Sequence, residues 1–246
     1  ILLVIYSIVL LIFGIKNDSR QIQKGDLFIG YPGAASDGRM YMEKAVLSGA
    51  VAIAYDPMDL PASCSLPKAV PCIPVSDLAN HLPEIARCFY HNPSHSINVT
   101  GVTGTNGKTT IAYQLAQAHD LLRRKAAYIG TIGQGAVHSL MPLDNTTPDA
   151  LCVQRLLYEY KQQGITEVCM EVSSHALSQH RVDGVAFKQA LFTNLTLDHL
   201  DYHLTMESYA AAKAQLFASD SLEWAIINQD AAYQELMSAR LKPHVK

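Results

Sequence analysis

A run of glycine, threonine and lysine residues gives the clearest sign of chemistry in this sequence. The segment GVTGTNGKTT, residues 101–110, follows an apolar run typical of a strand and precedes a run typical of a helix. A glycine-rich turn in that place exposes backbone N–H groups, and the start of the helix adds a partial positive charge, so the turn predicts a phosphate site. Lys108 would reach the β- and γ-phosphates of a nucleotide, and the Thr109 hydroxyl would bind Mg²⁺.

This loop is more compact than the strict Walker pattern, because Val102 stands where that pattern has its first glycine. A chance turn rich in glycine and threonine is the alternative, but the flanking strand and helix favour phosphate binding. The residues that we expect to form the nucleotide site are Gly104, Thr105, Asn106, Gly107, Lys108, Thr109 and Thr110.

A carboxylate at the end of a second apolar run is the next candidate. Glu171 closes the strand-like segment EVCME and precedes Ser173 and His175. A buried carboxylate is costly unless it meets a cation or hydrogen-bond donors. Glu171 therefore either shares Mg²⁺ with Thr109 or only caps a helix or forms an ion pair.

Three further segments carry polar residues whose role is open from the residues alone. DHLDYH offers Asp198 and His199, which either hold a metal or fix a loop, and no HExxH glutamate accompanies them. Arg181 could clamp a carboxylate or a diphosphate through two hydrogen bonds, or be an exposed loop charge. Lys213 by itself looks like a solvated helix lysine, and NTTPD at 145–149 like a capped turn.

The segments that position these residues alternate between strand and helix. We expect strands at 97–102, 126–132, 167–173, 189–193 and 224–228, and helices at 108–124, 149–163 and 206–218. This alternation predicts an α/β fold with a parallel sheet covered by helices on both faces. Since ligands of such sheets bind at the carboxyl ends of the strands, the segments 103–109, 171–175 and 194–199 should lie along one edge.

The preceding residues predict a smaller α/β unit. Strands are expected at 27–29, 50–56 and 72–75, and helices at 41–47 and 77–90. The polar segment HNPSHS, 91–96, reads as a linker. We therefore predict an amino-terminal domain over 1–90 and a central domain over 91–246.

Composition narrows the class of protein. Net charge is −3 over 246 residues, and Arg123-Arg124-Lys125 is the longest basic tract, so we expect no nucleic-acid partner. Five cysteines without a CxxC pair predict neither a disulfide framework nor a cysteine zinc site, which favours the cytoplasm. The apolar residues 1–15 are too few to span a bilayer and lack a basic start, so a buried segment or an altered start is favoured over a membrane anchor.

The motifs together resemble the Mur ligases, the ATP-dependent amide-forming enzymes of peptidoglycan synthesis. The loop GVTGTNGKTT is similar to their ATP loop, and residues 17–52 resemble their uridine-nucleotide-binding domain. NTTPDA, EVSSHALSQHRVDG and the segment 192–217 resemble their central domain, in the same order. The set is most similar to the branch that adds a diamino acid, usually meso-diaminopimelate, to UDP-N-acetylmuramoyl-L-alanyl-D-glutamate. The resemblance implies a monomer that uses ATP and Mg²⁺ and has no membrane association.

The resemblance also implies roles for single residues. Lys108, Glu171, His199 and Lys213 match catalytic positions, and Mg²⁺ ligands would be Thr109, Glu171, His199 and a carbamate formed on Lys213 from CO₂. Ala34 stands where some relatives carry a histidine, which puts a side-chain contact there in doubt. The matched contacts to the UDP-sugar-peptide are Asn17, Ser19, Ala34, Ala35, Ser36, Asn145, Thr146, Thr147, Ser173, Gln179 and Arg181.

The implied reaction forms an amide through an acyl phosphate. ATP would phosphorylate the D-glutamate side-chain carboxylate, and an amine would displace phosphate. The family has a third domain for the incoming amino acid, and this sequence stops at Lys246 without a match to it, so we expect binding without turnover. Two alternatives remain: a sister ligase, such as another Mur enzyme or a folylpolyglutamate synthetase, and a non-catalytic nucleotide-binding protein.

Overall fold

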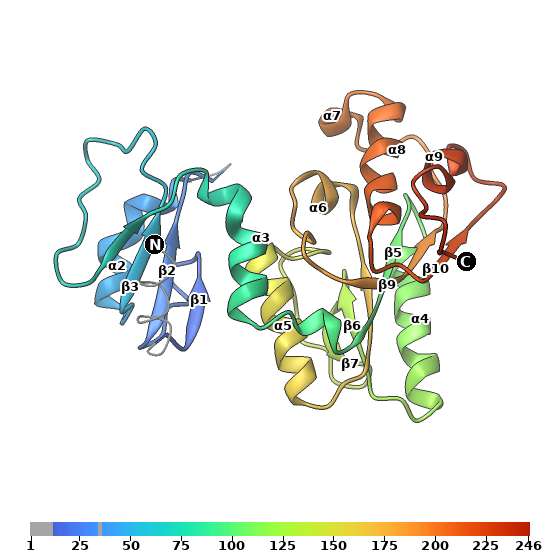
Figure 1. Ribbon diagram of the computed structural model, residues 1–246, viewed down its shortest axis with the longest axis horizontal. Coiled ribbons are helices and arrows are strands. Elements are labelled where there is room, and N and C mark those ends of the chain that lie inside the picture. The colour runs from blue at the N-terminus through green and yellow to red at the C-terminus, as the bar shows by residue number, and fades with distance from the viewer. Residues whose placement is uncertain (1–11, 34–35) are drawn as a thin grey trace. The chain divides into compact units, whose positions relative to one another are not determined.

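The computed structural model describes residues 12–33 and 36–246. The chain forms two compact units, residues 1–82 and 83–246, and their boundary falls within helix α3 (Leu78–Phe89), which contains Pro83 (Figure 1). Each unit has its own parallel sheet, which confirms the predicted fold class. Within the described residues, no helix is both long enough and apolar enough to cross a membrane.

The amino-terminal unit is a four-stranded parallel sheet in the order β1-β2-β3-β4. A 3-10 helix, η1 (Gly38–Tyr41), leads into α2 (Met42–Leu47) on the crossover from β2 to β3. All four side chains of β3 are buried, as its apolar sequence predicts. The strands are β1 (Gly14–Lys16), β2 (Asp26–Gly30), β3 (Ala52–Tyr55) and β4 (Cys72–Pro74).

The end of the apolar amino-terminal run forms an edge strand. Gly14–Lys16 pair in parallel with β2, and Ile15 is 2% exposed. Gly14 and Ile15 of this run are therefore buried, whereas Phe13 is 81% exposed. Residues 1–11 of the same run lie outside the described part of the chain.

The central unit is built on a six-stranded sheet in the order β10-β9-β5-β8-β6-β7, which is parallel except for β7. Its strands are β5 (Asn98–Thr103), β6 (Ala126–Gly130), β7 (Gly133–Ala136), β8 (Glu167–Glu171), β9 (Phe187–Phe192) and β10 (Trp224–Ile227). Its helices after α3 are η2 (Pro93–His95), α4 (Lys108–Leu121), α5 (Ala150–Gln162), α6 (Ser174–Ser178), α7 (Leu200–His203), α8 (Met206–Ala214), η3 (Gln215–Ala218) and α9 (Gln234–Ser238).

Side chains alternate between the two faces of this sheet, and each face has its own core. On one face Val102, Tyr128 and Cys169 pack against Ala112 and Ala116 of α4. The other face carries a larger core to which α5 and α8 contribute, and Figure 1 shows α4 and α5 on different sides of the sheet. The alternation places Glu171, two residues after Cys169, on the face covered by α4.

Among the differences between predicted and observed elements are a strand that ends early and a linker that contains a helix. The strand expected at 126–132 ends at Gly130, and a two-residue turn leads into the antiparallel strand β7, where Gly133 and Gly135 have positive φ angles. The segment expected as a linker, 91–96, contains η2, whose Pro93 and Ser94 are buried, and the Ser94 hydroxyl accepts from the Ala186 amide.

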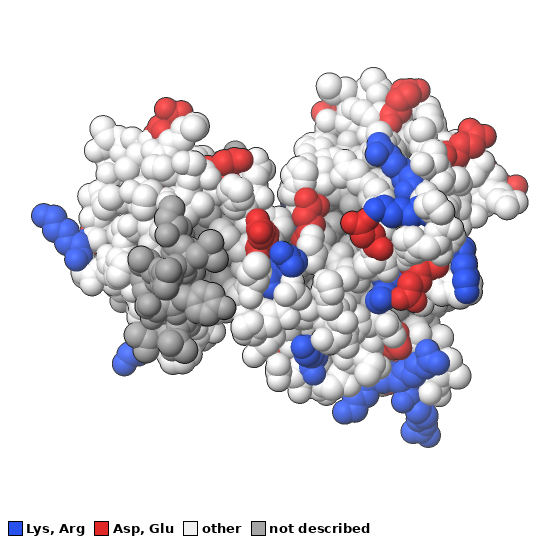
Figure 2. Space-filling view, in the orientation of Figure 1, with Lys and Arg blue, Asp and Glu red and all other residues white. Residues whose placement is uncertain are grey.

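Charged side chains are interspersed on the face of the central unit that Figure 2 shows, with a group of basic side chains at its lower end. Arg123, Arg124 and Lys125 follow the end of α4. The candidate site described next lies at the opposite end of α4, where this helix begins.

Candidate functional site

A cavity of about 440 Å³ opens at the carboxyl ends of the central strands. The loop after β5 supplies Thr105–Thr109, the turn after β6 supplies Thr131, and the end of β8 supplies Glu171. His199, which follows β9, also lines it. The edge of the sheet predicted to bind a ligand is therefore where the cavity lies.

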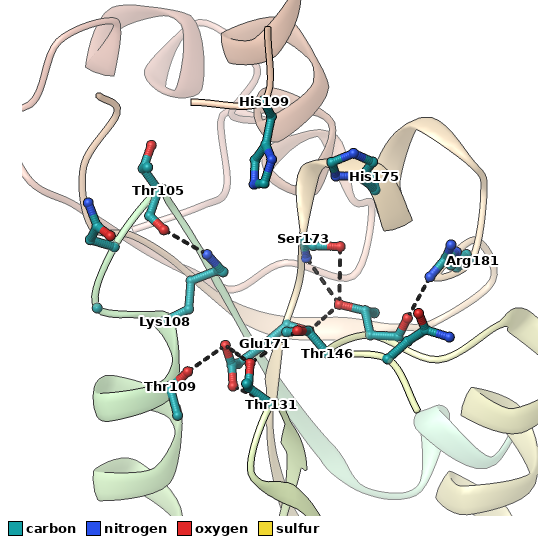
Figure 3. Close-up of a pocket in the computed structure, with 14 residues that line it drawn as sticks. Thr105, Lys108, Thr109, Thr131, Thr146, Glu171, Ser173, His175, Arg181 and His199 are labelled. Carbon is teal, nitrogen blue, oxygen red and sulfur yellow. Dashed lines mark hydrogen bonds between the residues drawn. The ribbon is translucent and has the colours of Figure 1, made fainter. Parts of the chain in front are cut away.

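The glycine-rich loop sets a lysine at the start of α4. Gly107 adopts φ 85° just before the helix, and the Lys108 Nζ donates to the carbonyls of Gly104 and Thr105, both at 2.9 Å. Burial lowers the pKa of Lys108, and the nearby charges of Glu171 and Asp198 oppose that shift. Figure 3 shows the Lys108 side chain directed toward the Thr105 carbonyl.

Two of the predicted nucleotide-loop residues do not line the cavity. Gly104 is buried, and a side chain there would meet the Thr193 Oγ1 at 1.9 Å, so the glycine permits a close approach of two loops. Thr110 is exposed on α4. The lining residues from this loop are Thr105, Asn106, Gly107, Lys108 and Thr109.

Glu171 is 1% exposed and is held by four neutral donors. Its Oε2 accepts from the hydroxyls of Thr109 at 2.9 Å and Thr131 at 3.3 Å, and its Oε1 accepts from the Thr131 amide at 2.8 Å and from the Tyr128 hydroxyl. Among the described residues none forms an ion pair with it. A carboxylate and a hydroxyl in contact are the oxygen ligands that Mg²⁺ prefers, so Thr109 and Glu171 fit this ion.

The other two predicted metal ligands are placed differently from each other. His199 lines the cavity and has a side chain that is 43% exposed, with its Nε2 3.6 Å from Asp198. Lys213 is 1% exposed on α8 and does not line the cavity; its Nζ donates to the Gly104 carbonyl at 2.8 Å and lies 4.4 Å from the Tyr209 ring centroid. Burial, and then the charge of Lys108, lower the pKa of Lys213 to about 7.

Within the described residues, no group of three or more histidine, cysteine or acidic side chains could hold a metal ion. Lys213 and Lys108 donate to the same carbonyl, that of Gly104, so α8 and the glycine-rich loop are directly joined. The metal-binding roles of His199 and Lys213 stay predictions.

Arg181 lies across the cavity from the glycine-rich loop (Figure 3). Its Nη1 donates to the Thr147 carbonyl at 3.0 Å, and its Nε and Nη2 donate to the Gln179 Oε1 at 3.0 and 2.5 Å. The Thr147 hydroxyl in turn accepts from the Ser173 amide at 3.1 Å. Gln179 is exposed and outside the cavity lining, so it orients Arg181 rather than facing the cavity. The other predicted substrate residues on this wall are Asn145, Thr146 and Thr147.

Sequence reasoning assigned no role to three residues of this site. Thr131 and His175 line the cavity, and the Tyr128 hydroxyl donates a hydrogen bond to Glu171. Thr131 lies near the carboxyl end of the strand predicted at 126–132, so the strand-end rule could have found it. The pKa of His175 is lowered by burial and then by His199, whose ring centroid is 4.9 Å away.

The amino-terminal unit has a cavity of its own, of about 450 Å³. It is lined by Asn17, Ser19 and Ser36, which the sequence assigned to uridine-nucleotide binding, together with Arg20 and Lys44. Ala34 and Ala35, predicted for the same site, lie outside the described residues.

Comparison with known proteins connects both units to one family. Residues 102–246 match the Mur ligase middle domain, and residues 11–90 match the Mur ligase family catalytic domain. The chain is 46% identical over 228 residues to the UDP-N-acetylmuramoyl-L-alanyl-D-glutamate–2,6-diaminopimelate ligase of Neisseria meningitidis serogroup A, covering 93% of this chain and 46% of that enzyme. For the enzyme of the same name from Pseudomonas aeruginosa, identity is 46% over 224 residues, with 90% and 45% covered.

Solved structures give the same picture for the fold. A structure of a ligase of that name superposes with a TM-score of 0.79 at 33% identity, covering 96% of this chain and 47% of the other. The MurF ligase of Thermotoga maritima, solved with ADP, shares the fold with a TM-score of 0.64 at 18% identity, covering 95% and 50%. The chain thus spans about half the length of the relatives that it matches. Because the middle-domain match alone covers more than half of its residues, the chain belongs to the Mur ligase family.

Proposed function

We propose that this chain provides the nucleotide- and UDP-substrate-binding part of an ATP-dependent ligase of peptidoglycan precursor synthesis. The proposed reaction adds a diamino acid, meso-diaminopimelate, to UDP-N-acetylmuramoyl-L-alanyl-D-glutamate. The observation that carries the proposal is one cavity with the glycine-rich loop and Lys108 on one wall and Arg181 on the other, with Glu171 between them. The names of the relatives supply the substrate class.

The residues on the two walls suit two anionic substrates. Lys108 and the backbone N–H groups at the start of α4 would bind the ATP phosphates, and Arg181 would bind a carboxylate or diphosphate of the UDP-sugar-peptide. Holding both in place brings the D-glutamate carboxylate oxygen in line with the γ-phosphorus. The oxygen attacks phosphorus as the bond to ADP breaks, and an amine then attacks the acyl phosphate and releases phosphate.

Mg²⁺ would be held by Thr109 and Glu171 and would neutralise the phosphate charge. We further propose that Lys213 carries a carbamate. An amine with a pKa of about 7 is largely neutral at physiological pH, and the neutral amine is the form that reacts with CO₂. Labelled bicarbonate should therefore give a carbamate carbon signal in NMR spectra, and the Lys213→Met variant should not.

Binding titrations test the proposed function directly. ATP and UDP-N-acetylmuramoyl-L-alanyl-D-glutamate are titrated separately into the full chain and into the Lys108→Ala variant, with Mg²⁺ present. We expect the substitution to weaken ATP binding by roughly 10- to 100-fold, because a charged hydrogen bond to phosphate is lost, and to leave the uridine ligand unaffected. Lys161→Ala, at the exposed end of α5, is the matched control.

A different pattern would contradict the proposal. If the wild-type chain and the Lys108→Ala variant bind ATP with equal affinity, the proposed nucleotide site is wrong. Tighter binding of a pteroate compound than of the UDP-sugar-peptide would favour a folylpolyglutamate-type ligase instead.

A further inference from the structure

Tyr128 is a fully buried tyrosine whose hydroxyl donates to the Oε1 of Glu171. It lies on β6, on the face of the sheet that α4 covers, and β6 pairs in parallel with β8 so that Tyr128 is opposite Cys169. Glu171 is on the same face two residues further along β8. The tyrosine ring therefore reaches diagonally across the two strands to the carboxylate.

A glycine leaves the space for this reach. Gly130 stands between Tyr128 and the turn, and a side chain there would meet the Tyr128 hydroxyl oxygen at 2.1 Å and the Glu171 Oε1 at 2.2 Å. Tyr128 is held from the other side by Tyr113 of α4, with ring centroids 5.5 Å apart and planes at 88°. The hydroxyl is thus fixed by packing as well as by its hydrogen bond.

The two oxygens of Glu171 face different kinds of donor. Oε1 accepts from the hydroxyl of Tyr128, whose ring is buried and packed against Tyr113, and from the backbone amide of Thr131 at 2.8 Å. Oε2 accepts from the hydroxyls of Thr109 and Thr131 at 2.9 and 3.3 Å. Both of these hydroxyls line the cavity and can rotate to other acceptors. Oε2 is consequently the oxygen that a cation in the cavity can bind.

We infer that Tyr128 is a positioning residue that restricts Glu171 to binding a divalent cation through one oxygen. This inference rests on the proposed nucleotide function, because the cation is the one that accompanies the phosphates. A carboxylate limited to one oxygen suits Mg²⁺, which takes six ligands in a strict octahedron. Ca²⁺ accepts carboxylates through both oxygens, so the restriction favours Mg²⁺ over Ca²⁺.

The test compares two tyrosines that are in contact with each other. Tyr128→Phe removes the donor to Glu171, whereas Tyr113→Phe removes a hydroxyl that donates to the Val137 carbonyl at 3.2 Å and does not contact Glu171. ADP binding to the full chain is titrated in EDTA, in Mg²⁺ and in Ca²⁺. Each cation raises the affinity for ADP, and the concentration that gives half of this gain is determined for Mg²⁺ and for Ca²⁺. The ratio of these two concentrations is then compared between variants.

We expect Tyr128→Phe to weaken the response to Mg²⁺ by roughly tenfold, as for other partners that orient a metal ligand, and to weaken the response to Ca²⁺ less. ADP affinity in EDTA should be unchanged, and Tyr113→Phe should match the wild-type chain in all three conditions. Tyr128→Met, which keeps bulk in the core without a donor, should repeat the result if the phenylalanine variant does not fold.

The inference is overturned if the Mg²⁺-to-Ca²⁺ ratio is the same in the wild-type, Tyr128→Phe and Tyr113→Phe chains, or if both variants shift it equally. A loss of ADP affinity in EDTA would assign Tyr128 a purely structural role. If the wild-type chain itself binds ADP with no response to either cation, both this inference and the proposed Mg²⁺ site fail. The wild-type titration thus distinguishes failure of the Tyr128 inference alone from failure of the proposed Mg²⁺ site.

Discussion

Arg39 in the amino-terminal unit and Lys213 and Glu171 in the central unit are buried charged side chains with different kinds of partner. In the amino-terminal unit Arg39 is 4% exposed and pairs with Asp37 at 2.7 Å, and its remaining N–H groups donate to backbone carbonyls of residues 56, 58 and 59. In the central unit Lys213 and Glu171 are each 1% exposed. Neither forms an ion pair within the described part of the chain.

For these three residues the difference follows their location. A buried charge without a counter-ion lowers stability, so a fold keeps one where hydrogen-bond donors hold it, where a ligand supplies the opposite charge or where the group acts in its neutral form. Glu171 lines the central cavity and Lys213 contacts its glycine-rich loop, whereas Arg39 does not line the amino-terminal cavity. Arg39 therefore holds the fold of its unit, and Glu171 and Lys213 belong to a site.

The largest expected effect comes from breaking the paired charge. Arg39→Met removes the guanidinium donors of Asp37 and of three backbone carbonyls, and it should destabilise the amino-terminal unit by roughly 3–5 kcal/mol. Hydrogen exchange at the β2 and β3 amides measures this. Arg20→Met is the matched control, because Arg20 pairs with Asp18 at the same 2.7 Å but its side chain is 79% exposed. That variant should lose less than about 1 kcal/mol, and equal losses in both would contradict the comparison.

The fold could be predicted largely from the sequence, because its elements have strong local signals. The apolar runs of β5 and β8 and the capped start of α5 at Asp149 are where the pattern placed them. Strand β7 was missed because its sequence, GQGA, has no apolar alternation. It forms because the positive φ angles at Gly133 and Gly135 allow a tight return and because β6 offers a free edge.

The residues of the site could be predicted only where a local sequence motif indicates them. The glycine-rich loop and Glu171 follow from strand ends, and the structure places both in the cavity. Tyr128 could not be found in this way, since a tyrosine in an apolar strand reads as core. Its contact with Glu171 depends on the register of β6 against β8 and on the missing side chain of Gly130, which only the tertiary structure fixes.

In the central unit one substitution should raise the free energy of unfolding instead of lowering it, by an intermediate amount. Lys213→Met removes a buried amine, and at pH 6 in CO₂-free buffer it should stabilise the chain by roughly 2–4 kcal/mol. The folded-state pKa of about 7 lies below the ordinary 10.5, so between these values the unfolded chain binds more protons and wild-type stability rises with pH. The gain should therefore shrink toward zero by pH 10. Urea unfolding at pH 6, 8 and 10 measures it.

Lys161→Met, at an exposed position of α5, is the control for this substitution and should change stability little at any pH. A Lys213→Met variant that is less stable than the wild-type chain at pH 6 would show that the amine is well accommodated. In that case Lys213 would not belong with the unpaired charges of the site.

The smallest expected effect concerns the stability that Asp37 contributes and that is lost at acidic pH. Side-chain hydrogen bonds from Arg39 hold the pKa of Asp37 below its ordinary value of 3.8. Stability from this carboxylate is thus present above pH 3.8 and is lost as the pH falls through the lower folded-state pKa. Asp37→Asn leaves the buried Arg39 guanidinium without its counter-ion, and it also removes the acid-dependent part of the stability, which should be about 1 kcal/mol because the Asp37 side chain is partly exposed. It should also flatten the acid dependence of exchange at the β2 and β3 amides below pH 4, while exchange at β5 and β8 stays as in the wild-type chain. If the acid dependence in the amino-terminal unit is unchanged, the Arg39–Asp37 pair is not what stabilises that unit. The structural role assigned to the paired charge would then be wrong.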